Sequence, residues 1–511
     1  MWDKLISGAN RAIALLIFFG LCATYASLTP GAIAGMGYTG EEMQAGDSML
    51  AIPRAILSGQ PLQAIKWSRH GPLPVILDLP FLALGRWVVS EEFTLCFEPV
   101  LFTALLVTLL FVWLGKLTCN GLAFLLAMAG AFGTMFWPYA YIGLELKQSF
   151  FLILAGYLGL ACGPIRSYSR ALLFGISCAI AISAKSTGIV LLPAVAYLFY
   201  IQFREPRRQR IRFGALVVSA IGVAWVLNSL GRAQFWSARG GAFRNLRPLF
   251  IGSPFAYFSN MIGMLGSPTK GLFLFAPPLL VSVYAVPKAW RAHRDVTAFA
   301  LLVVGGVMCG FAFLRFFADE VWGPRYLHCC VAPLLLIIGA SRTRFSLRRD
   351  ALLIPLTALG VAVSFLGAIY YYGVLHFAAI RTSQNSAEQL VGDPVWNQVQ
   401  FNARLFEVWL KHPPGRVPWT PTHLWMYKRP PDLPPDKSID LREFAQPQAM
   451  LVRFWGVPRP RLVSIVCALL LACAILGPLL LTGAGYLIWS QRVRSADEGV
   501  KEGSGPAVTC A

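Results

Sequence analysis

Acidic and basic side chains gather in a few polar segments of an otherwise apolar chain. The first of these segments carries three acids, Glu41, Glu42 and Asp47, followed by the basic residues Arg69 and His70. A carboxylate held at a dry interface can act as a general base toward a hydroxyl or an amine. A neighbouring Arg, Lys or His can hold a phosphate leaving group. These residue types indicate general-base chemistry beside a phosphate, and the simpler alternative is that the acids only solvate a loop.

Two more cations stand at the edges of later apolar runs. Lys270 lies in SPTKG and Arg325 in WGPRY. A guanidinium or ammonium fixed at a membrane boundary attracts phosphate strongly, because the low dielectric strengthens the pair. The alternative for both residues is an anchor that reaches toward the lipid headgroups. Asp319 and Glu320 precede WGPRY and are suited to pairing with Arg325, to binding a divalent ion or to contacting an acceptor, although two acids alone make a weak metal site.

Two other polar segments lie between apolar runs. Lys185, in ISAKSTG, is predicted to occupy the turn that joins two short runs. Residues 231–270 combine arginines with aromatic side chains. That composition suits anionic headgroups or a pyrophosphate-containing glycolipid. Generic anchoring at the interface is the alternative.

The elements that position these residues are membrane spans. Of the 511 residues, 56% are hydrophobic and only 13% are charged, whereas soluble domains carry about 25% charged residues. Apolar runs of about 18 residues or more recur along the chain and predict membrane spans. This excludes a soluble enzyme, a disordered protein and a fibrous protein. Most cysteines lie in the spans without disulfide or zinc spacing, and Cys329 and Cys330 are predicted to pack inside a helix.

Basic clusters alternate with the apolar runs. The 44 basic and 24 acidic residues give a net charge of +20. Cytoplasmic loops collect Lys and Arg, so topology explains most of this charge and nucleic acid is not a predicted partner. The pattern predicts an all-α polytopic membrane protein with about twelve crossings and both termini in the cytoplasm. The predicted spans are about 12–29, 94–115, 121–137, 148–163, 171–184, 187–203, 213–230, 271–288, 296–315, 327–341, 351–372 and 462–489.

Residues 72–90 are apolar enough to cross, but a crossing there would invert every later loop. It would also place Asp78 and Arg86 at depth. The segment is therefore predicted to lie in, or dip into, the outer interface. Its prolines are expected to break a helix; they are Pro72, Pro74 and Pro80.

The chain is predicted to have three parts. Residues 1–372 form a transmembrane catalytic module whose first outer loop is 30–90, residues 373–460 lie outside, and residues 461–511 hold the last span and a cytoplasmic tail. A transporter keeps ionisable groups at mid-membrane and little mass outside. Here the acids and aromatics crowd the outer segments, which predicts chemistry at the outer surface. The tryptophans of 373–460 suit either acceptor binding or the core of a small cap.

Three stretches, in order, resemble elements of known enzymes. The first comprises Asp47, Met49–Gly59 and Arg69–Pro74; the second is GSPTKGLFLFAPPLL at 266–280; the third is DEVWGPRYLHCCVAPLLL at 319–336. With the span pattern, they resemble bacterial glycosyltransferases of the GT-C superfamily. These are relatives of the protein O-mannosyltransferases, the aminoarabinose transferases and the rhizobial lipopolysaccharide-core transferases.

The resemblance implies a GT-C-like helical bundle with interfacial helices and a catalytic first outer loop. It implies transfer of a sugar from a polyprenyl-phosphate donor to a glycolipid, polysaccharide or protein acceptor on the outer face. By motif position Asp47 is the nearest candidate for the base. Glu42 and Glu41 stay candidates, because alignment of the interfacial helix puts the family's acid two residues before Asp47.

The resemblance also implies that cations at the outer boundary hold the donor phosphate. The candidates are Arg325, His70, Arg69 and Lys270. His70 takes the place of the basic residue before the Pro-rich element of the family. A second rank of candidates comprises Asp319, Glu320, Glu145 and Lys147. The last two lie in a turn that is close to the active site in similar proteins, and their alternative is an ion pair at a helix end.

The resulting prediction is a multi-pass enzyme of the bacterial inner membrane with an extracytoplasmic active site. No metal site is predicted and no cofactor is required, while a divalent cation stays open. Two other classes stay open as well. One is a transporter or flippase for lipid-linked sugars, and the other is a non-catalytic envelope-assembly protein that handles them.

Overall fold

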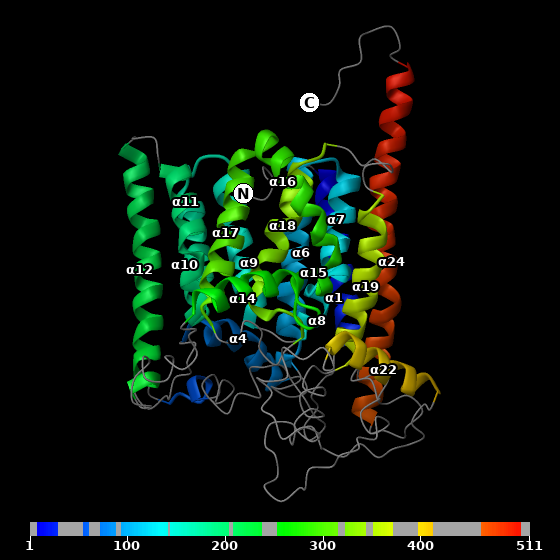
Figure 1. The fold of residues 1–511 in the computed structure, drawn as a ribbon, viewed down its shortest axis with the longest axis horizontal. Coiled ribbons are helices and arrows are strands. Elements are labelled where there is room, and N and C mark those ends of the chain that lie inside the picture. Colours follow the sequence, from blue (N-terminus) through cyan, green and yellow to red (C-terminus); the bar gives the residue numbers. More distant parts are fainter. Residues whose placement is uncertain are drawn as a thin grey trace, which may run out of the picture.

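Every element of the described residues is a helix, which confirms the all-α prediction. The computed structural model describes residues 8–28, 55–60, 72–87, 94–141, 144–203, 208–237, 253–314, 322–343, 351–370, 397–411 and 461–501. The longer helices run side by side as an upright bundle, with α12 and α24 at its opposite edges (Figure 1).

The helices follow the apolar runs of the sequence. Their bounds are α1 (Gly8–Ser27), α4 (Pro72–Gly85), α6 (Phe97–Leu117), α7 (Asn120–Gly133), α8 (Phe136–Tyr139), α9 (Leu144–Gly156), η3 (Tyr157–Ala161), α10 (Tyr168–Ser183), η4 (Ser186–Leu191), α11 (Leu192–Phe203), α12 (Arg208–Ser237), α14 (Pro254–Gly266), α15 (Leu272–Phe275), η6 (Pro277–Leu279), α16 (Leu280–Ala292), α17 (Arg294–Ala312), η7 (Arg325–Leu327), α18 (His328–Ala340), α19 (Leu353–Ile369), α22 (Gln398–Lys411) and α24 (Arg461–Lys501).

Each predicted span coincides with one helix or with a run of consecutive helices. Among the described residues, 5 helices are long and apolar enough to cross a membrane by length and composition. Several others are apolar but shorter, such as α7, α10 and α19. The number of crossings therefore stays a prediction.

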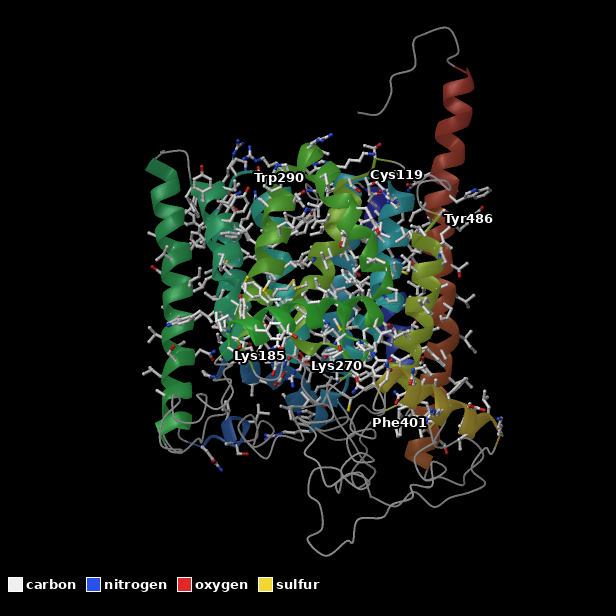
Figure 2. All side chains as sticks on the ribbon, in the orientation of Figure 1. Cys119, Lys185, Lys270, Trp290, Phe401 and Tyr486 are labelled. Carbon is white, nitrogen blue, oxygen red and sulfur yellow. The ribbon has the colours of Figure 1, made fainter. Side chains whose placement is uncertain are left out.

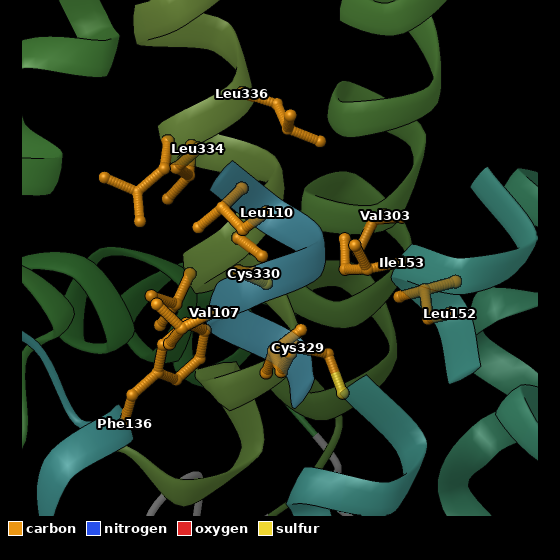
Figure 3. Packing of buried hydrophobic residues seen from close by; sticks show 14 of the residues in the cluster. Val107, Leu110, Phe136, Leu152, Ile153, Val303, Cys329, Cys330, Leu334 and Leu336 are labelled. Atoms are coloured by element: carbon orange, nitrogen blue, oxygen red, sulfur yellow. The ribbon is translucent and has the colours of Figure 1, made fainter. Parts of the chain in front are cut away.

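The core lies where α6, α9, α17 and α18 meet. Figure 3 shows Val107 and Leu110 of α6 close to Cys330 and Leu334 of α18 in this cluster. A helix that is apolar all round is expected at such a buried position. Cys329 and Cys330 are buried free thiols of α18, which confirms their predicted place inside a helix.

Small residues let neighbouring helices approach closely. A Cβ added at Gly360 of α19 would overlap the carbonyl oxygen of Gly133 at the end of α7. A Cβ at Gly306 of α17 would likewise overlap the carbonyl oxygen of Val190 in η4. Such contacts are typical of helix packing in membranes, where close backbone approach replaces the hydrophobic driving force.

Arg170 closes the far end of the α9–η3 helix. Its guanidinium donates to the carbonyl oxygens of Leu158, Cys162, Gly163 and Pro164, at 2.9 Å from Cys162 O and 3.0 Å from Pro164 O. The last carbonyls of a helix have no partner within the helix. Here one arginine side chain supplies hydrogen-bond donors to carbonyls at this helix end.

The two ends of the bundle separate the predicted loops. Cys119, Trp290 and Tyr486 lie toward the upper end in Figure 2, while Lys185, Lys270 and Phe401 lie toward the lower end. Cys119 and Trp290 belong to segments predicted to be cytoplasmic, and Tyr486 lies near the predicted cytoplasmic end of the span 462–489. The lower set belongs to segments predicted to be outside. The topology, including which end faces the cytoplasm, stays a prediction.

The expectation that prolines break the segment at 72–90 is wrong. Residues Pro72–Gly85 form the helix α4, with Pro80 inside it. Pro72 and Pro74 lie in the first turn, where a missing N–H costs nothing, so only Pro80 removes a helical hydrogen bond. α4 lies at the lower end of the bundle (Figure 1), as expected of an interfacial segment.

Candidate active site

The structure describes four of the predicted site residues, and all four are buried. They are Glu145, Lys147, Lys270 and Arg325. The remaining candidates lie outside the described residues, so their predicted roles stay predictions. They are Glu41, Glu42, Asp47, Arg69, His70, Asp319 and Glu320.

Glu145 joins two cations from different helices. Its Oε1 accepts a hydrogen bond from Arg325 Nε at 2.5 Å and also pairs with Lys185 Nζ. The residues are only 2% (Glu145), 3% (Arg325) and 7% (Lys185) exposed. We call these three side chains the Glu145 cluster. Because water is excluded, each charge depends on the others for its stabilisation.

Three short elements bring this cluster together. Glu145 lies in the first turn of α9, Lys185 between α10 and η4, and Arg325 at the start of η7. The Lys185 position confirms the predicted turn. Arg325 and Glu145 are both in buried ion pairs, so the alternative of a snorkelling anchor is wrong for Arg325.

The backbone before Arg325 is held by packing and a tight turn. Trp322 is fully buried, with its ring edge-on to Phe275 at 5.1 Å, and its carbonyl accepts from Tyr139 Oη at 3.1 Å. Gly323 has φ 62°, which a residue with a side chain rarely adopts. The anchored tryptophan and this turn aim Arg325 into the bundle.

A small cavity lies beside the cluster. Its lining includes the polar residues Glu145, Gln148 and Lys185 and apolar side chains such as Val307 and Phe311. Its free volume of about 10 Å³ is close to the minimum for one water molecule.

An aromatic stack supports Lys185 at the cavity wall. The Tyr326 ring lies flat against Phe311, with centroids 4.2 Å apart and an angle of 13°. Lys185 Nζ lies 5.4 Å from the centroid of Tyr326. The ring face attracts the ammonium, so the lysine is held from one side by a carboxylate and from another by a ring.

Lys147 belongs to a second buried cluster. Its Nζ pairs with Asp78 of α4 and lies 3.3 Å from Glu98 Oε1 of α6. Glu145 and Lys147 are two positions apart in α9, and residues at that spacing do not face each other. Glu145 and Lys147 are both in ion pairs at a helix end, which was the alternative to a role in the active site. Glu145 pairs with Lys185 and Arg325, and Lys147 pairs with Asp78 and Glu98.

Lys270 is tied to the segment that was predicted to form an outer cap. Its Nζ donates to Gln398 Oε1 of α22 at 3.0 Å, and the same oxygen accepts from Gly323 N at 3.0 Å. Lys270 is buried, which contradicts a snorkelling anchor. Gln398 thus links α22 to the turn that positions Arg325.

A layer of polar side chains lies behind the Glu145 cluster. Ser149 Oγ and His328 Nδ1 are 2.8 Å apart, and Gln148 Nε2 donates to Ala181 O at 2.8 Å. The Cys329 thiol contacts this layer and also lines the cavity. The first two turns of α9 therefore present buried polar groups to several helices at once.

Sequence reasoning missed Lys185, Asp78, Glu98 and Gln398 as members of these clusters. A signal existed for Asp78, since an acid inside an apolar segment near a membrane usually has a partner. Lys185 carried the same signal as Lys270, a cation at the edge of an apolar run. Within the described residues, no group of three or more His, Cys, Asp or Glu side chains is arranged to hold a metal ion.

Comparison with known proteins gives a structural similarity only. No family model and no curated protein matches the chain. Solved structures similar to it include ArnT from Cupriavidus metallidurans bound to undecaprenyl phosphate, at 15% identity and TM-score 0.45, covering 96% of this chain and 78% of ArnT. ArnT in the apo state is similar at 15% identity and TM-score 0.44, covering 94% and 76%.

Proposed function

We propose that this protein is a membrane glycosyltransferase that moves a sugar from a polyprenyl-phosphate donor to an acceptor on the outer face of the membrane. The observation that carries the proposal is the Glu145 cluster, in which Lys185 and Arg325 share one buried carboxylate beside a cavity. Fixed cations in a low-dielectric site stabilise developing negative charge far better than cations in water. A departing polyprenyl phosphate develops such charge.

Each group has one role in the reaction. A loop carboxylate, Asp47 with Glu42 and Glu41 as the other candidates, takes the proton of the acceptor hydroxyl or amine. The freed electron pair attacks the anomeric carbon of the sugar, and the bond between that carbon and the phosphate oxygen breaks. The electron pair of that bond leaves with the polyprenyl phosphate, and Arg325 and Lys185 stabilise the negative charge of that phosphate.

Glu145 is given a holding role in this scheme. Two cations at close range repel each other unless an anion lies between them. The carboxylate is already engaged in charge-assisted hydrogen bonds to both, which suits fixing their positions better than taking up a proton. Lys270 lies at the same end of the bundle and is a further donor-phosphate candidate, together with Arg69 and His70.

The three predicted parts of the chain fit this function. Residues 1–372 form the catalytic module, residues 373–460 contact the acceptor, and residues 461–511 hold the last helix and the tail. The contact of Gln398 with Lys270 and Gly323 supports the second part, because it joins that segment to the turn that carries Arg325. The predicted location is the bacterial inner membrane, with the lower end of Figure 1 outward.

The test uses purified protein in lipid and a panel of polyprenyl-phosphate sugars. Wild type is compared with Asp47→Asn, Glu42→Gln and Glu41→Gln for the base, and with Arg325→Gln for the phosphate. We expect one carboxylate variant to lose most turnover and Arg325→Gln to lose on the order of 100- to 1000-fold in kcat, as for the loss of one donor to a developing anion.

The matched control is Arg294→Gln. Arg294 starts α17 at the other end of the bundle, where its guanidinium lies over the Trp290 ring, so turnover should not change. Full turnover in all three carboxylate variants would remove the loop base. Binding of the donor without turnover by wild type would favour a transporter, and neither binding nor turnover would favour an assembly protein.

A further inference from the structure

Helix α4 is fastened to the bundle by two polar contacts. Near its start, the backbone N–H of Leu73 donates to Asn228 Oδ1 of α12 at 3.2 Å. In its middle, Asp78 pairs with Lys147 of α9. Asp78, Lys147 and Asn228 are all buried, so water does not compete for these groups.

Apolar packing covers only part of α4. Asp78 and Leu82 are buried one turn apart, whereas Ile76 and Leu84 are about half exposed, at 48% and 54%. The buried face of this helix therefore includes a charged residue. A buried charge needs a partner, so the position of α4 depends on the partner of Asp78 as well as on apolar contact.

The same contacts lead to the Glu145 cluster. Lys147 and Glu145 share the first turn of α9. Asn228 Nδ2 donates to the carbonyl of Ser183, at the end of α10 and two residues before Lys185. One contact of α4 thus leads to the end of α10, close to Lys185, and the other leads to the first turn of α9, which also carries Glu145.

We propose that Lys147 is a positioning residue that, through Asp78, fixes α4 across the end of the bundle beside the Glu145 cluster. Because α4 belongs to the predicted first outer loop, its position fixes this part of the loop relative to the Glu145 cluster. The catalytic consequence rests on the proposed function. The fastening itself does not, since it is a property of the fold.

Glu98 provides a matched control. Its Oε1 lies 3.3 Å from Lys147 Nζ, the same nitrogen that pairs with Asp78. Glu98 is as buried as Asp78, but it belongs to the bundle helix α6. Asp78→Ala and Glu98→Ala each remove one buried carboxylate from the same lysine. Only the first removes a carboxylate that α4 contributes.

The experiment measures hydrogen–deuterium exchange of the full chain in lipid, followed by kcat and KM. In Asp78→Ala we expect exchange of the α4 amides at 76–85 to rise at least about tenfold, because loss of one member of a buried pair strongly favours local opening. The α18 amides should stay as in wild type. Lys147→Met should act like Asp78→Ala, and Lys147→Arg should recover much of the protection.

In Asp78→Ala we expect kcat to fall, with a smaller change in KM. In Glu98→Ala we expect hydrogen exchange of the α4 amides to stay as in wild type. Equal effects of Asp78→Ala and Glu98→Ala would overturn the proposal, since the lysine would then serve only general packing. If Asp78→Ala folds poorly, Asp78→Asn in the same assay gives a smaller change of the same kind, and no change there also overturns it.

Two outcomes separate this inference from the proposed function. Exchange needs no substrate, so the fastening is tested even if wild type shows no transferase activity. Loss of α4 protection with full turnover would overturn the catalytic positioning by Lys147 and leave the transferase assignment intact.

Discussion

Replacing Glu145 by Gln should destabilise the protein through two stranded cations. The substitution keeps the shape of the side chain and removes the charge that Lys185 and Arg325 share. Loss of one partner from a buried pair costs about 3–5 kcal/mol, because the remaining charge stays buried. With the usual unfolding entropy per residue, a chain of 511 residues changes its midpoint by about 1 °C per kcal/mol. We therefore expect a midpoint about 3–5 °C lower.

The assay is thermal unfolding in lipid nanodiscs, followed by tryptophan fluorescence, on four proteins. They are wild type, Glu145→Gln, Lys185→Met and the double variant. Removing Lys185 as well leaves only one cation, Arg325, beside the neutral glutamine. The double variant should therefore lose less stability than the two single variants lose in sum. For residues that share one ion network, the interaction free energy is expected to be about 0.5–3 kcal/mol.

Glu407→Gln is the control for loss of a carboxylate. Glu407 pairs with Lys411 on α22 at 2.6 Å, but the two side chains are 59% and 66% exposed. Water and salt screen such a pair, so the midpoint should not change. The reasoning would be refuted if Glu145→Gln unfolded at the same temperature as Glu407→Gln, or if the double variant were simply additive.

Two further predictions concern packing and the α22 contact. Gly360→Ala should lower the free energy of unfolding by about 1–3 kcal/mol, because the new methyl meets the carbonyl of Gly133. The control is Gly222→Ala in α12, whose new methyl points into open space and should leave stability unchanged or raise it by up to about 1 kcal/mol. Thermal unfolding measures both, and equal effects would contradict the close helix contact. Lys270→Met should speed hydrogen exchange of the α22 amides, because it removes the 3.0 Å bond to Gln398. Gln398→Ala should speed it more, because it also removes the bond from Gly323 N, and unchanged α22 exchange in either variant would contradict the link.

The helices could be predicted from sequence because each is encoded locally. An apolar run of membrane length leaves few alternatives, since its backbone must satisfy its own hydrogen bonds in lipid. The same reasoning failed for Pro72–Gly85, where the number of prolines suggested a break. Position within the helix matters more than number, and only Pro80 occupies a place where an N–H is lost.

The partners in the site could not be predicted in the same way. Arg325 stood out as a cation at a boundary, but its partner Glu145 lies 180 residues away. Which side chains meet depends on how α9 and η7 are rotated and shifted against each other, and close packing over many helices decides that. Lys185 and Asp78 were visible as charges near a membrane, while their ion pairs with α9 required the tertiary structure.

The four carbonyl oxygens that Arg170 satisfies have a consequence for reading charge in this class of protein. An arginine that the predicted topology counts as a cytoplasmic charge acts in the structure as a cap for backbone carbonyls. The charge still counts in the loop, yet the two terminal nitrogens of Arg170 are already bonded to backbone carbonyls. Lysine would keep the same charge but lacks the planar guanidinium whose two terminal nitrogens share the four carbonyls, so the two residues would be equivalent in a charge count and unequal in the finished fold.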